Sequence, residues 1–156
     1  MATRNRSSTQ PPTILNRRAR YDYELGDELV VGLSLTGQEV RAAREGHVQL
    51  RGAFVTLRDQ QLWLNNASFS LKLNERGTPS SQTVDTSPRR LLAHRKQIDA
   101  LIAQKTAGHT IVPLRLLTAG RYIKLVIAPG RGKKRYDKRE TIKRRDQARD
   151  AARMMR

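Results

Sequence analysis

The stretch TIVPLRLLTAGRYIKLVI, residues 110–127, contains two segments of strand character joined by a turn at residues 118–120. In the second segment Ile123, Leu125 and Ile127 share one face of a strand, because side chains alternate along it. Two such segments around a short turn predict an antiparallel hairpin. This hairpin decides the fold class. Short strands at close spacing with few helices favour a small antiparallel barrel over a parallel sheet.

More strands are predicted toward the N-terminus. Residues 20–35 have strand character, because tyrosine and leucine alternate with acids. Residues 49–69 predict a second hairpin that turns at residues 59–61. The apolar faces of these strands need a further element to cover them.

Helices are predicted at two places. After a polar stretch at residues 72–87, which predicts a loop, Ser87 suits the cap of a helix, Pro88 its first turn and Gly108 its end. Apolar residues recur in this helix at i, i+3 and i+4, so we expect it to form a lid on the sheet. Residues 36–45 are helix-prone, but a kinked strand fits them as well.

Composition divides the chain into three parts. Residues 1–15 are rich in Ser, Thr, Gln and Pro and predict a disordered leader. Residues 16–129 predict the β-barrel domain. Residues 130–156 form a basic tail with 12 lysines or arginines and four acids, a net charge of +8. The tail has little apolar surface to bury, so we expect it to be disordered when free and ordered on a large polyanion.

The tail also contains a helix-start pattern. Asp137 can cap a helix whose third residue, Glu140, reciprocates. The charge pairs that follow stabilise a helix by only about 0.2–0.5 kcal/mol each, too little to hold it in isolation. The pattern therefore predicts a tail that becomes helical when bound, and capping alone also explains both acids.

The formal net charge of +17 makes nucleic acid the first partner to consider. An anionic membrane surface is the competitor, but the tail lacks the large apolar stripe of an interfacial helix. The chain contains no apolar run long enough to span a membrane and no apolar segment typical of a secretory signal. We therefore expect a soluble cytoplasmic protein without membrane association.

Residues for catalysis or cofactor binding are not apparent. His47, His94 and His109 lie far apart in the sequence without a metal-ligand pattern, and the chain has no cysteine. No phosphate loop of the Walker type and no Ser–His–Asp arrangement stands out. The sequence predicts a protein that is not an enzyme and that carries no cofactor and no metal.

Four blocks resemble the SsrA-binding protein (small protein B) family, the partner of transfer-messenger RNA. The family's tail signature, G-K-K-x-x-D-K-R-E-x-I-K-x-R-D, is matched from Gly132 to Asp146. The other blocks are Asn16–Arg20, Thr36–Arg41 with Arg44 following, and Arg90–Arg95. The blocks occur in the family's order from Asn16 to Arg156, which makes the resemblance much more specific than one basic motif.

The resemblance implies a fold and a function. The fold would be mainly β with helices, a small antiparallel oligonucleotide-binding-like barrel followed by the basic tail. The barrel would grip the tRNA-like domain of transfer-messenger RNA, monomeric in that complex. The tail would occupy the empty mRNA channel, walled by 16S rRNA, near the decoding centre of a stalled ribosome. Tagging of the nascent chain and ribosome rescue, together called trans-translation, would follow.

The resemblance also implies two sets of RNA contacts. The set for transfer-messenger RNA is Asn16, Arg17, Glu39, Arg41, Arg44 and Lys124, with Gly130 and Gly132 letting the tail leave the barrel. A salt bridge that orients Arg41 or Arg44 explains Glu39 equally well. The set for the decoding region is Lys133, Lys134, Tyr136, Asp137, Lys138, Arg139, Lys143 and Arg145.

The chain departs from the family pattern at three places. Tyr136 stands where histidine is frequent, although either ring can stack on a base. Gln147 stands where an aromatic residue is common in the family. The segment before Pro88 differs from the sequence that the family usually has there. No RNA contact is transferred to Gln147 or to that segment.

Two other functions are compatible with the residues. One is a constitutive ribosomal protein with a basic extension, and the other is an RNA-modifying enzyme, for which no candidate residue set exists. Identification of the RNA that the protein retains separates them from the adaptor, which should recover one abundant RNA with a tRNA-like end.

Overall fold

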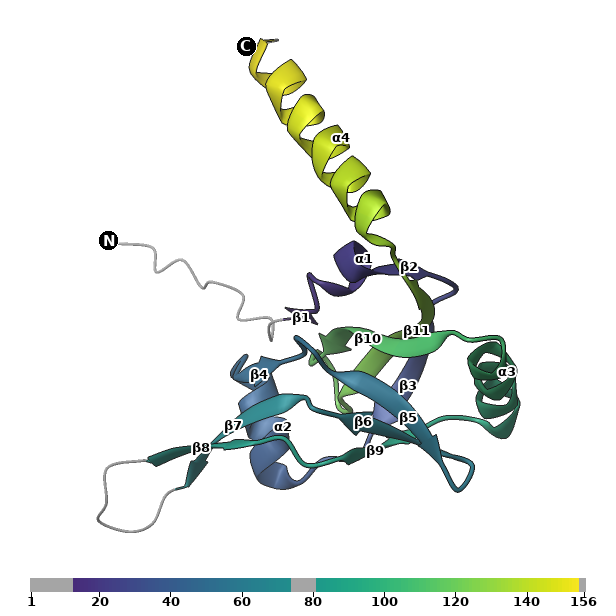
Figure 1. The fold of residues 1–156 in the computed structure, drawn as a ribbon. Helices are drawn as coiled ribbons and strands as arrows, with labels where there is room; N and C mark the ends of the chain where they lie inside the picture. Colours follow the sequence, from purple (N-terminus) through teal and green to yellow (C-terminus); the bar gives the residue numbers. More distant parts are fainter. Residues whose placement is uncertain (1–12, 74–80, 155–156) are drawn as a thin grey trace, which may run out of the picture.

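The protein is described by a computed structural model over residues 13–73 and 81–154. An eight-stranded sheet has the order β1-β10-β5-β6-β9-β3-β11-β2, and the pairing of β10 with β11 closes six of these strands into a barrel (Figure 1). The predicted class, mainly β with helices around a small antiparallel barrel, is confirmed. The strands are β1 (Ile14–Leu15), β2 (Tyr23–Leu25), β3 (Leu29–Leu33), β4 (Val48–Gln49), β5 (Phe54–Arg58), β6 (Gln61–Asn65), β7 (Ser68–Leu73), β8 (Ser81–Asp85), β9 (Arg89–Leu92), β10 (Thr110–Leu117) and β11 (Lys124–Gly132).

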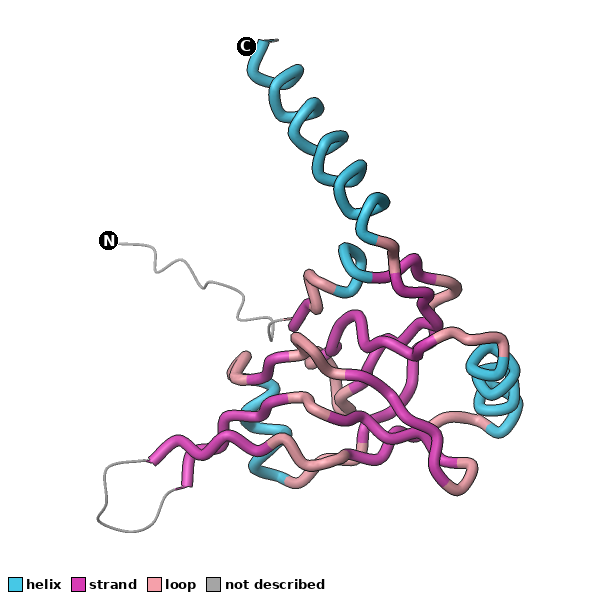
Figure 2. The backbone as a smooth tube through the Cα atoms, in the orientation of Figure 1, coloured by secondary structure: helices cyan, strands magenta, loops and turns pink. Residues whose placement is uncertain are grey.

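Four helices complete the described part of the chain, and Figure 2 separates them by colour from the strands. They are α1 (Ala19–Asp22), α2 (Gly37–Arg44), α3 (Arg95–Thr106) and α4 (Arg135–Met154). Figure 1 shows α3 beside the barrel and α4 projecting away from it on the side of α1 and β2. The barrel core and the projecting helix are thus spatially distinct.

The predicted hairpin is the longest strand pair of the barrel. Strands β10 and β11 pair from Thr110↔Gly130 to Leu117↔Lys124, with a register shift between Pro113 and Arg115. Proline cannot donate a ladder hydrogen bond, which explains why the strand is irregular at this point. As predicted, Ile123, Leu125 and Ile127 face the same side and are buried in the main core.

A second, smaller core lies on the other side of this hairpin. Val112, Leu114, Val126 and Ala128 pack there against Ala19, which belongs to the N-terminal segment. This segment therefore covers what would otherwise be an exposed apolar face. The prediction of a strand from residue 20 was wrong for the first turn, because Ala19–Asp22 form α1 before β2 begins. The predicted disordered leader was likewise too long, since Ile14–Leu15 pair with β10. Residues 1–12 of the predicted leader lie outside the described residues.

The structure decides the open alternative for residues 36–45 in favour of a helix. The hydroxyl of Thr36 accepts a hydrogen bond from the backbone N–H of Glu39 at 3.4 Å. The Glu39 carboxylate in turn accepts from the N–H of Thr36 at 2.7 Å. This reciprocal capping box starts α2. The left-handed Gly46, with φ of 81°, follows its end, as the glycine signal indicated.

The predicted hairpin within residues 49–69 is also confirmed. Its turn residues Asp59 and Gln60 have φ of 51° and 58°, the left-handed conformation of a two-residue turn that suits the twist of a hairpin. Neither residue is glycine, so the alternation of apolar and polar residues in the strands on both sides is the signal that predicts the turn.

The predicted loop and helix start around residues 72–95 were wrong. Residues 72, 73 and 81–85 extend the hairpin of β7 and β8. Arg89–Leu92 form β9, which is hydrogen-bonded between β3 and β6. Pairing within the barrel outweighed the helical periodicity there. Helix α3 starts only after His94, and its buried residues Ile98 and Leu101 cover the core as expected of the lid.

The tail segment also begins differently from the prediction. Strand β11 continues to Gly132 and pairs with β2, so the first three residues of the predicted tail belong to the sheet. The N–H of Lys134 donates to Asp137 Oδ2 at 3.1 Å. Asp137 is therefore the reciprocating acid inside the first turn, and the predicted helix start was three residues late. That this segment is helical is confirmed, and that it unfolds away from RNA stays a prediction.

Candidate nucleic-acid interface

One basic edge is formed by the end of α2 and the turn between β10 and β11. The guanidinium of Arg44 donates to the carbonyl oxygens of Gly120 and Arg121 at 3.4 and 3.3 Å. Arg41 is 73% exposed and pairs with Glu45 at 3.1 Å. The chain brings Arg41, Arg44 and Arg121 together on one exposed edge, next to the exposed ring of Tyr122. Such an edge can contact phosphates and stack on a base.

Glu39 lies beneath this edge. The residue is 7% exposed, and its Oε1 accepts a hydrogen bond from Arg89 Nε at 2.7 Å. Its carboxylate therefore binds the cap of α2 and a buried arginine. The salt bridge with Arg41 or Arg44 that the sequence suggested is instead made with Arg89. This geometry favours a supporting role, and a direct contact of Glu39 with RNA stays a prediction.

Arg89 connects α2 to the β7–β8 hairpin. Its guanidinium donates to the carbonyl oxygens of Ala67 and Ser87 at 3.3 and 2.7 Å and lies 3.9 Å from the centre of the Phe69 ring. It also pairs with Asp85 at 3.2 Å. A buried charge is tolerated when its hydrogen-bonding groups are satisfied, and here they are largely satisfied.

Asp85 contributes a carboxylate whose pKa lies below the ordinary value of 3.8. The hydroxyl of Ser87 and its backbone N–H, at 2.9 Å, donate to this carboxylate and stabilise the ionised form, and Arg89 adds to the effect. The acid is therefore ionised at neutral pH and helps to hold Arg89.

Lys124 lies on the outer face of the barrel. Register places it opposite Gly32 of β3, which is in turn opposite Leu92 of β9. Leu92 is 52% exposed and Val30, two residues before Gly32, is 48% exposed. A cation beside an exposed apolar strip on the outer face of the barrel is suited to the backbone and the base faces of a folded RNA.

Asn16 and Arg17 belong to the N-terminal segment packed on β10. The side chain of Asn16 is buried and donates through Nδ2 to the carbonyl of Pro113 at 2.9 Å, while its N–H donates to Leu114 at 2.7 Å. Both bonds satisfy carbonyls at the irregular position of β10. The Asn16 side chain is thus engaged inside the protein, and its contact with RNA stays a prediction. Arg17 is exposed and lines a pocket of about 350 Å³ with Arg20 and Arg115.

The two glycines at the start of the tail are strand residues. Gly130 is buried, and a Cβ added to it would lie 3.1 Å from Tyr23 Cβ, so its missing side chain admits β2. A Cβ on Gly132 would meet nothing within 4 Å. The close approach of β2 explains Gly130, whereas nothing in the structure requires glycine at position 132.

The base of the tail contacts α1. The N–H of Lys133 donates to the carbonyl of Asp22 at 2.9 Å, and Lys138 Nζ donates to the Asp22 carboxylate at 3.1 Å. Partial burial raises the pKa of Asp22, but the hydrogen bond and charge of Lys138, with those of Arg18, lower it overall. The carboxylate is therefore ionised at neutral pH.

Beyond this base, α4 carries most of the tail residues predicted to meet the decoding region. Arg139, Lys143 and Arg145 are exposed, as is Lys134, while Lys133, Asp137 and Lys138 are half-buried at the base. The Tyr136 side chain lies outside the described part of the structure. Gln147, where the family pattern has an aromatic residue, is exposed on α4. The helix presents a line of cations that the body does not cover.

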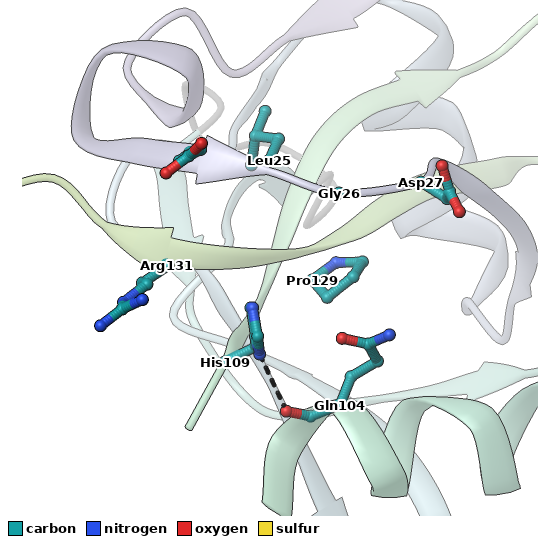
Figure 3. Close-up of a pocket in the computed structure, with 8 residues that line it drawn as sticks. Leu25, Gly26, Asp27, Gln104, His109, Pro129 and Arg131 are labelled. Carbon is teal, nitrogen blue, oxygen red and sulfur yellow. Dashed lines mark hydrogen bonds between the residues drawn. The ribbon is translucent and has the colours of Figure 1, made fainter. Parts of the chain in front are cut away.

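A further pocket of about 390 Å³ lies between β2, β11 and the end of α3 (Figure 3). Its lining includes the acids Glu24 and Asp27, together with Arg131 and His109. His109 Nδ1 lies 3.2 Å from the Gln104 carbonyl oxygen. Since two carboxylates repel phosphate, this pocket does not suit an RNA backbone.

Within residues 13–73 and 81–154, no three His, Asp or Glu side chains gather in a way that could hold a metal ion. None of the helices described there is both long and apolar enough to cross a membrane.

Sequence reasoning missed three contributors to the surface. Arg89 supports Glu39, Leu92 flanks Lys124, and Asp22 anchors the tail. Only Asp22 had a local signal, because it is an acid two residues after the basic run from Arg17 to Arg20. The other two depend on strand pairing that the sequence pattern did not predict.

Comparison with known proteins agrees with this geometry. A family model described as "SmpB protein" matches residues 13–156. A relative named SsrA-binding protein from Oenococcus oeni is 44% identical over 141 residues, covering 86% of each chain. Another of the same name from a Roseiflexus species is 40% identical over 141 residues, covering 90% of this chain and 88% of the relative.

A solved structure is similar as well. It is described as "tmRNA-SmpB: a journey to the center of the bacterial ribosome", and it matches with a TM-score of 0.59 and 32% identity over 84% of this chain and 94% of that chain. The family match extends from the first described residue through the basic tail. The chain therefore belongs to the SmpB family of SsrA-binding proteins.

Proposed function

We propose that this protein is an RNA-binding adaptor that binds the tRNA-like domain of transfer-messenger RNA and delivers it to stalled ribosomes for trans-translation. One observation carries the proposal: the closed barrel presents a basic edge, while α4 extends a separate line of cations beyond it. The two surfaces suit two different RNA partners held by one chain. The relatives' name and the ribosomal context of the similar solved structure support it.

The barrel is the proposed contact with transfer-messenger RNA. Arg41 and Arg44 on α2 and Lys124 on β11 offer charges from a rigid frame, which suits recognition of RNA shape and backbone. Arg17 adds an exposed cation. Asn16 and Glu39 are assigned supporting roles, because both side chains are engaged inside the protein.

The tail is the proposed ribosomal contact. An exposed helix with the cations Arg139, Lys143 and Arg145 suits a channel walled by rRNA phosphates, where mRNA is missing. Its charges would replace counterions of the rRNA phosphates. Residues 16–129 would thus serve binding of transfer-messenger RNA and residues 130–156 delivery.

In this role the protein positions RNA and catalyses no reaction itself. It needs no cofactor, works as a monomer in its complex with transfer-messenger RNA, and acts in the cytoplasm where ribosomes translate. The transfer of the nascent chain takes place in the ribosome.

Two variants test the division of labour. Ending the chain after Lys134 keeps the pairing of β11 with β2 and removes α4. We expect its affinity for the tRNA-like domain to stay within about threefold of the full chain, while tagging in a reconstituted translation system is lost. Lys124→Ala is the reciprocal variant, which should weaken binding of the tRNA-like domain by about tenfold, a contact worth roughly 1–3 kcal/mol, with α4 intact.

The result that would overturn the proposal is loss of tRNA-like-domain binding on removal of α4, or normal tagging without it. Circular dichroism and a thermal melt of both variants verify that the barrel is folded. Recovery of many unrelated RNAs with the purified protein would also contradict it.

A further inference from the structure

The base of α4 is held by the N-terminal segment at two points one helical turn apart. At the first point, the backbone of Lys133 continues the β2–β11 ladder by donating to the Asp22 carbonyl at 2.9 Å. At the second, Lys138 Nζ bonds the Asp22 carboxylate at 3.1 Å. A single residue thus contacts the chain both before the helix begins and one turn inside it.

Two fixed points determine the direction of a helix, whereas one leaves it free to pivot. The first turn is itself closed by the bond from Lys134 N–H to Asp137, so it behaves as a rigid unit. Without the Lys138 contact, this unit would be held only through Lys133, whose backbone and side-chain bonds both lie before the helix begins. The axis of α4 would then vary with the backbone angles of residues 133–134.

Neighbouring groups support the Asp22 contact. Arg18 Nε lies 3.5 Å from the same carboxylate, and Lys133 Nζ donates to the Arg20 carbonyl at 3.0 Å. Lys138 Nζ also lies 5.8 Å from the centre of the Tyr21 ring. The Asp22 and Lys138 side chains are 27% and 33% exposed, so solvent screens this pair less than a fully exposed one.

We infer that Asp22 is a positioning residue for the tail, which sets the direction in which α4 leaves the barrel and so aims it at its RNA. The inference rests on the proposed function for its consequence, the delivery of the tail. Its physical core, the fixed direction of the first turns, does not depend on that function.

Direction matters because the barrel and the tail must reach two RNAs at once. When two binding elements are joined, the second binds at an effective concentration set by how well the linkage matches the spacing of the sites. A helix that pivots spreads its cations over many directions and lowers this effective concentration. Asp22 would therefore affect delivery without touching either RNA.

The direction can be measured on the full chain. The protein contains no cysteine, so Ala100→Cys on α3 and Thr141→Cys on α4 give two unique spin-label sites. Pulsed electron spin resonance then reports the distribution of distances between them. Thr141 lies in the first two turns of α4, which the Asp22 anchor holds even where the rest of the free tail unfolds. We therefore expect a narrow distribution for the parent and one at least twice as wide for Asp22→Asn, which keeps the size of the side chain and removes its charge.

Three further variants complete the design. Asp22→Glu keeps the charge and should restore the narrow distribution. Asp27→Asn removes an exposed acid from the same N-terminal segment and should leave the distribution unchanged. Lys138→Gln should widen it as much as Asp22→Asn does, and combining the two should widen it no further, because both remove the same contact.

Function is read in the same reconstituted tagging system. Asp22→Asn should lower tagging about three- to tenfold while affinity for the tRNA-like domain stays within twofold, and Asp22→Glu should recover most of the loss. Equal distance distributions for the parent and Asp22→Asn would overturn the inference, as would a widened distribution with unchanged tagging. If removal of α4 left tagging intact, the proposed function would fail, yet the distance measurement would still decide whether Asp22 sets the direction.

Discussion

Arg89 is the residue on which the described geometry of the basic edge most depends. It is 4% exposed and connects the Glu39 carboxylate of α2 to carbonyls of the β7–β9 region. Helix α2 presents Arg41 and Arg44, so the direction of both depends on this buried pair. A buried charge can in this way control two exposed charges that are proposed to contact RNA.

Replacing Arg89 should therefore cost far more stability than replacing its neighbour Arg90, which is exposed. We expect Arg89→Met to lower the free energy of unfolding by about 3–5 kcal/mol, because Glu39 is left as an unpaired buried charge. Arg90→Met should change it by less than about 0.5 kcal/mol. Urea denaturation at neutral pH measures both.

A second substitution makes the reason for the loss testable. In the Arg89→Met background, Glu39→Gln removes the stranded charge and should recover part of the lost stability. If the double variant were less stable than Arg89→Met alone, loss of packing rather than of charge pairing would be the cause.

At the scale of elements, α4 differs from the other helices in how little covers it. Past its first turn the described side chains are exposed, apart from the half-buried Ile142. Its stability must come from its own capping, its charge pairs and the anchor at Asp22. Isolated helices of such sequences are marginal in water.

A peptide of residues 130–156 should therefore be mostly unfolded on its own. We expect circular dichroism in dilute buffer to give helicity below roughly a quarter, since nucleation is costly and each charge pair stabilises little. Adding structured RNA should raise the helicity, and trifluoroethanol is the control for the intrinsic ability to form a helix. A peptide that is mainly helical without RNA would contradict the predicted disorder of the free tail.

For the whole molecule, the charge of +17 is divided between a rigid body and a projecting helix. Both parts attract RNA by releasing counterions, so the salt dependence of binding counts phosphate contacts separately for each partner. The salt dependence of binding, measured for each RNA partner, therefore tests without an activity assay which part of the protein contacts which RNA.

Removing α4 should reduce the salt dependence of ribosome binding and leave that of tRNA-like-domain binding nearly unchanged. Each phosphate contact adds roughly 0.7–0.9 to the slope of log affinity against log salt, so about three to five tail contacts predict a loss of roughly 2–4 units for the ribosome. Affinities of the full chain and of the chain ending at Lys134, titrated between 50 and 200 mM salt, give these slopes. An equal loss for both partners would mean that the tail binds RNA without distinction.

The sequence by itself determined features that depend on neighbouring residues. The alternation from Ile123 to Ile127 gave the central hairpin, and the spacing of acids and cations indicated a helical tail. Resemblance of ordered blocks identified the family. For the hairpin and the helix, the deciding interactions lie within a turn or between strands joined by a short turn, and such interactions leave periodic patterns in the sequence.

Only the tertiary structure decided the roles that depend on residues distant in the chain. The bond of Asn16 to Pro113 spans 97 residues, that of Arg89 to Glu39 spans 50, and that of Lys138 to Asp22 spans 116. No spacing rule encodes such partners. Residues 89–92 became a strand for the same reason, because barrel closure supplied hydrogen bonds on both sides that helical periodicity could not match. The fold thus engages the side chains of Asn16 and Glu39 in bonds inside the protein, and it brings Asp22 to the base of the tail.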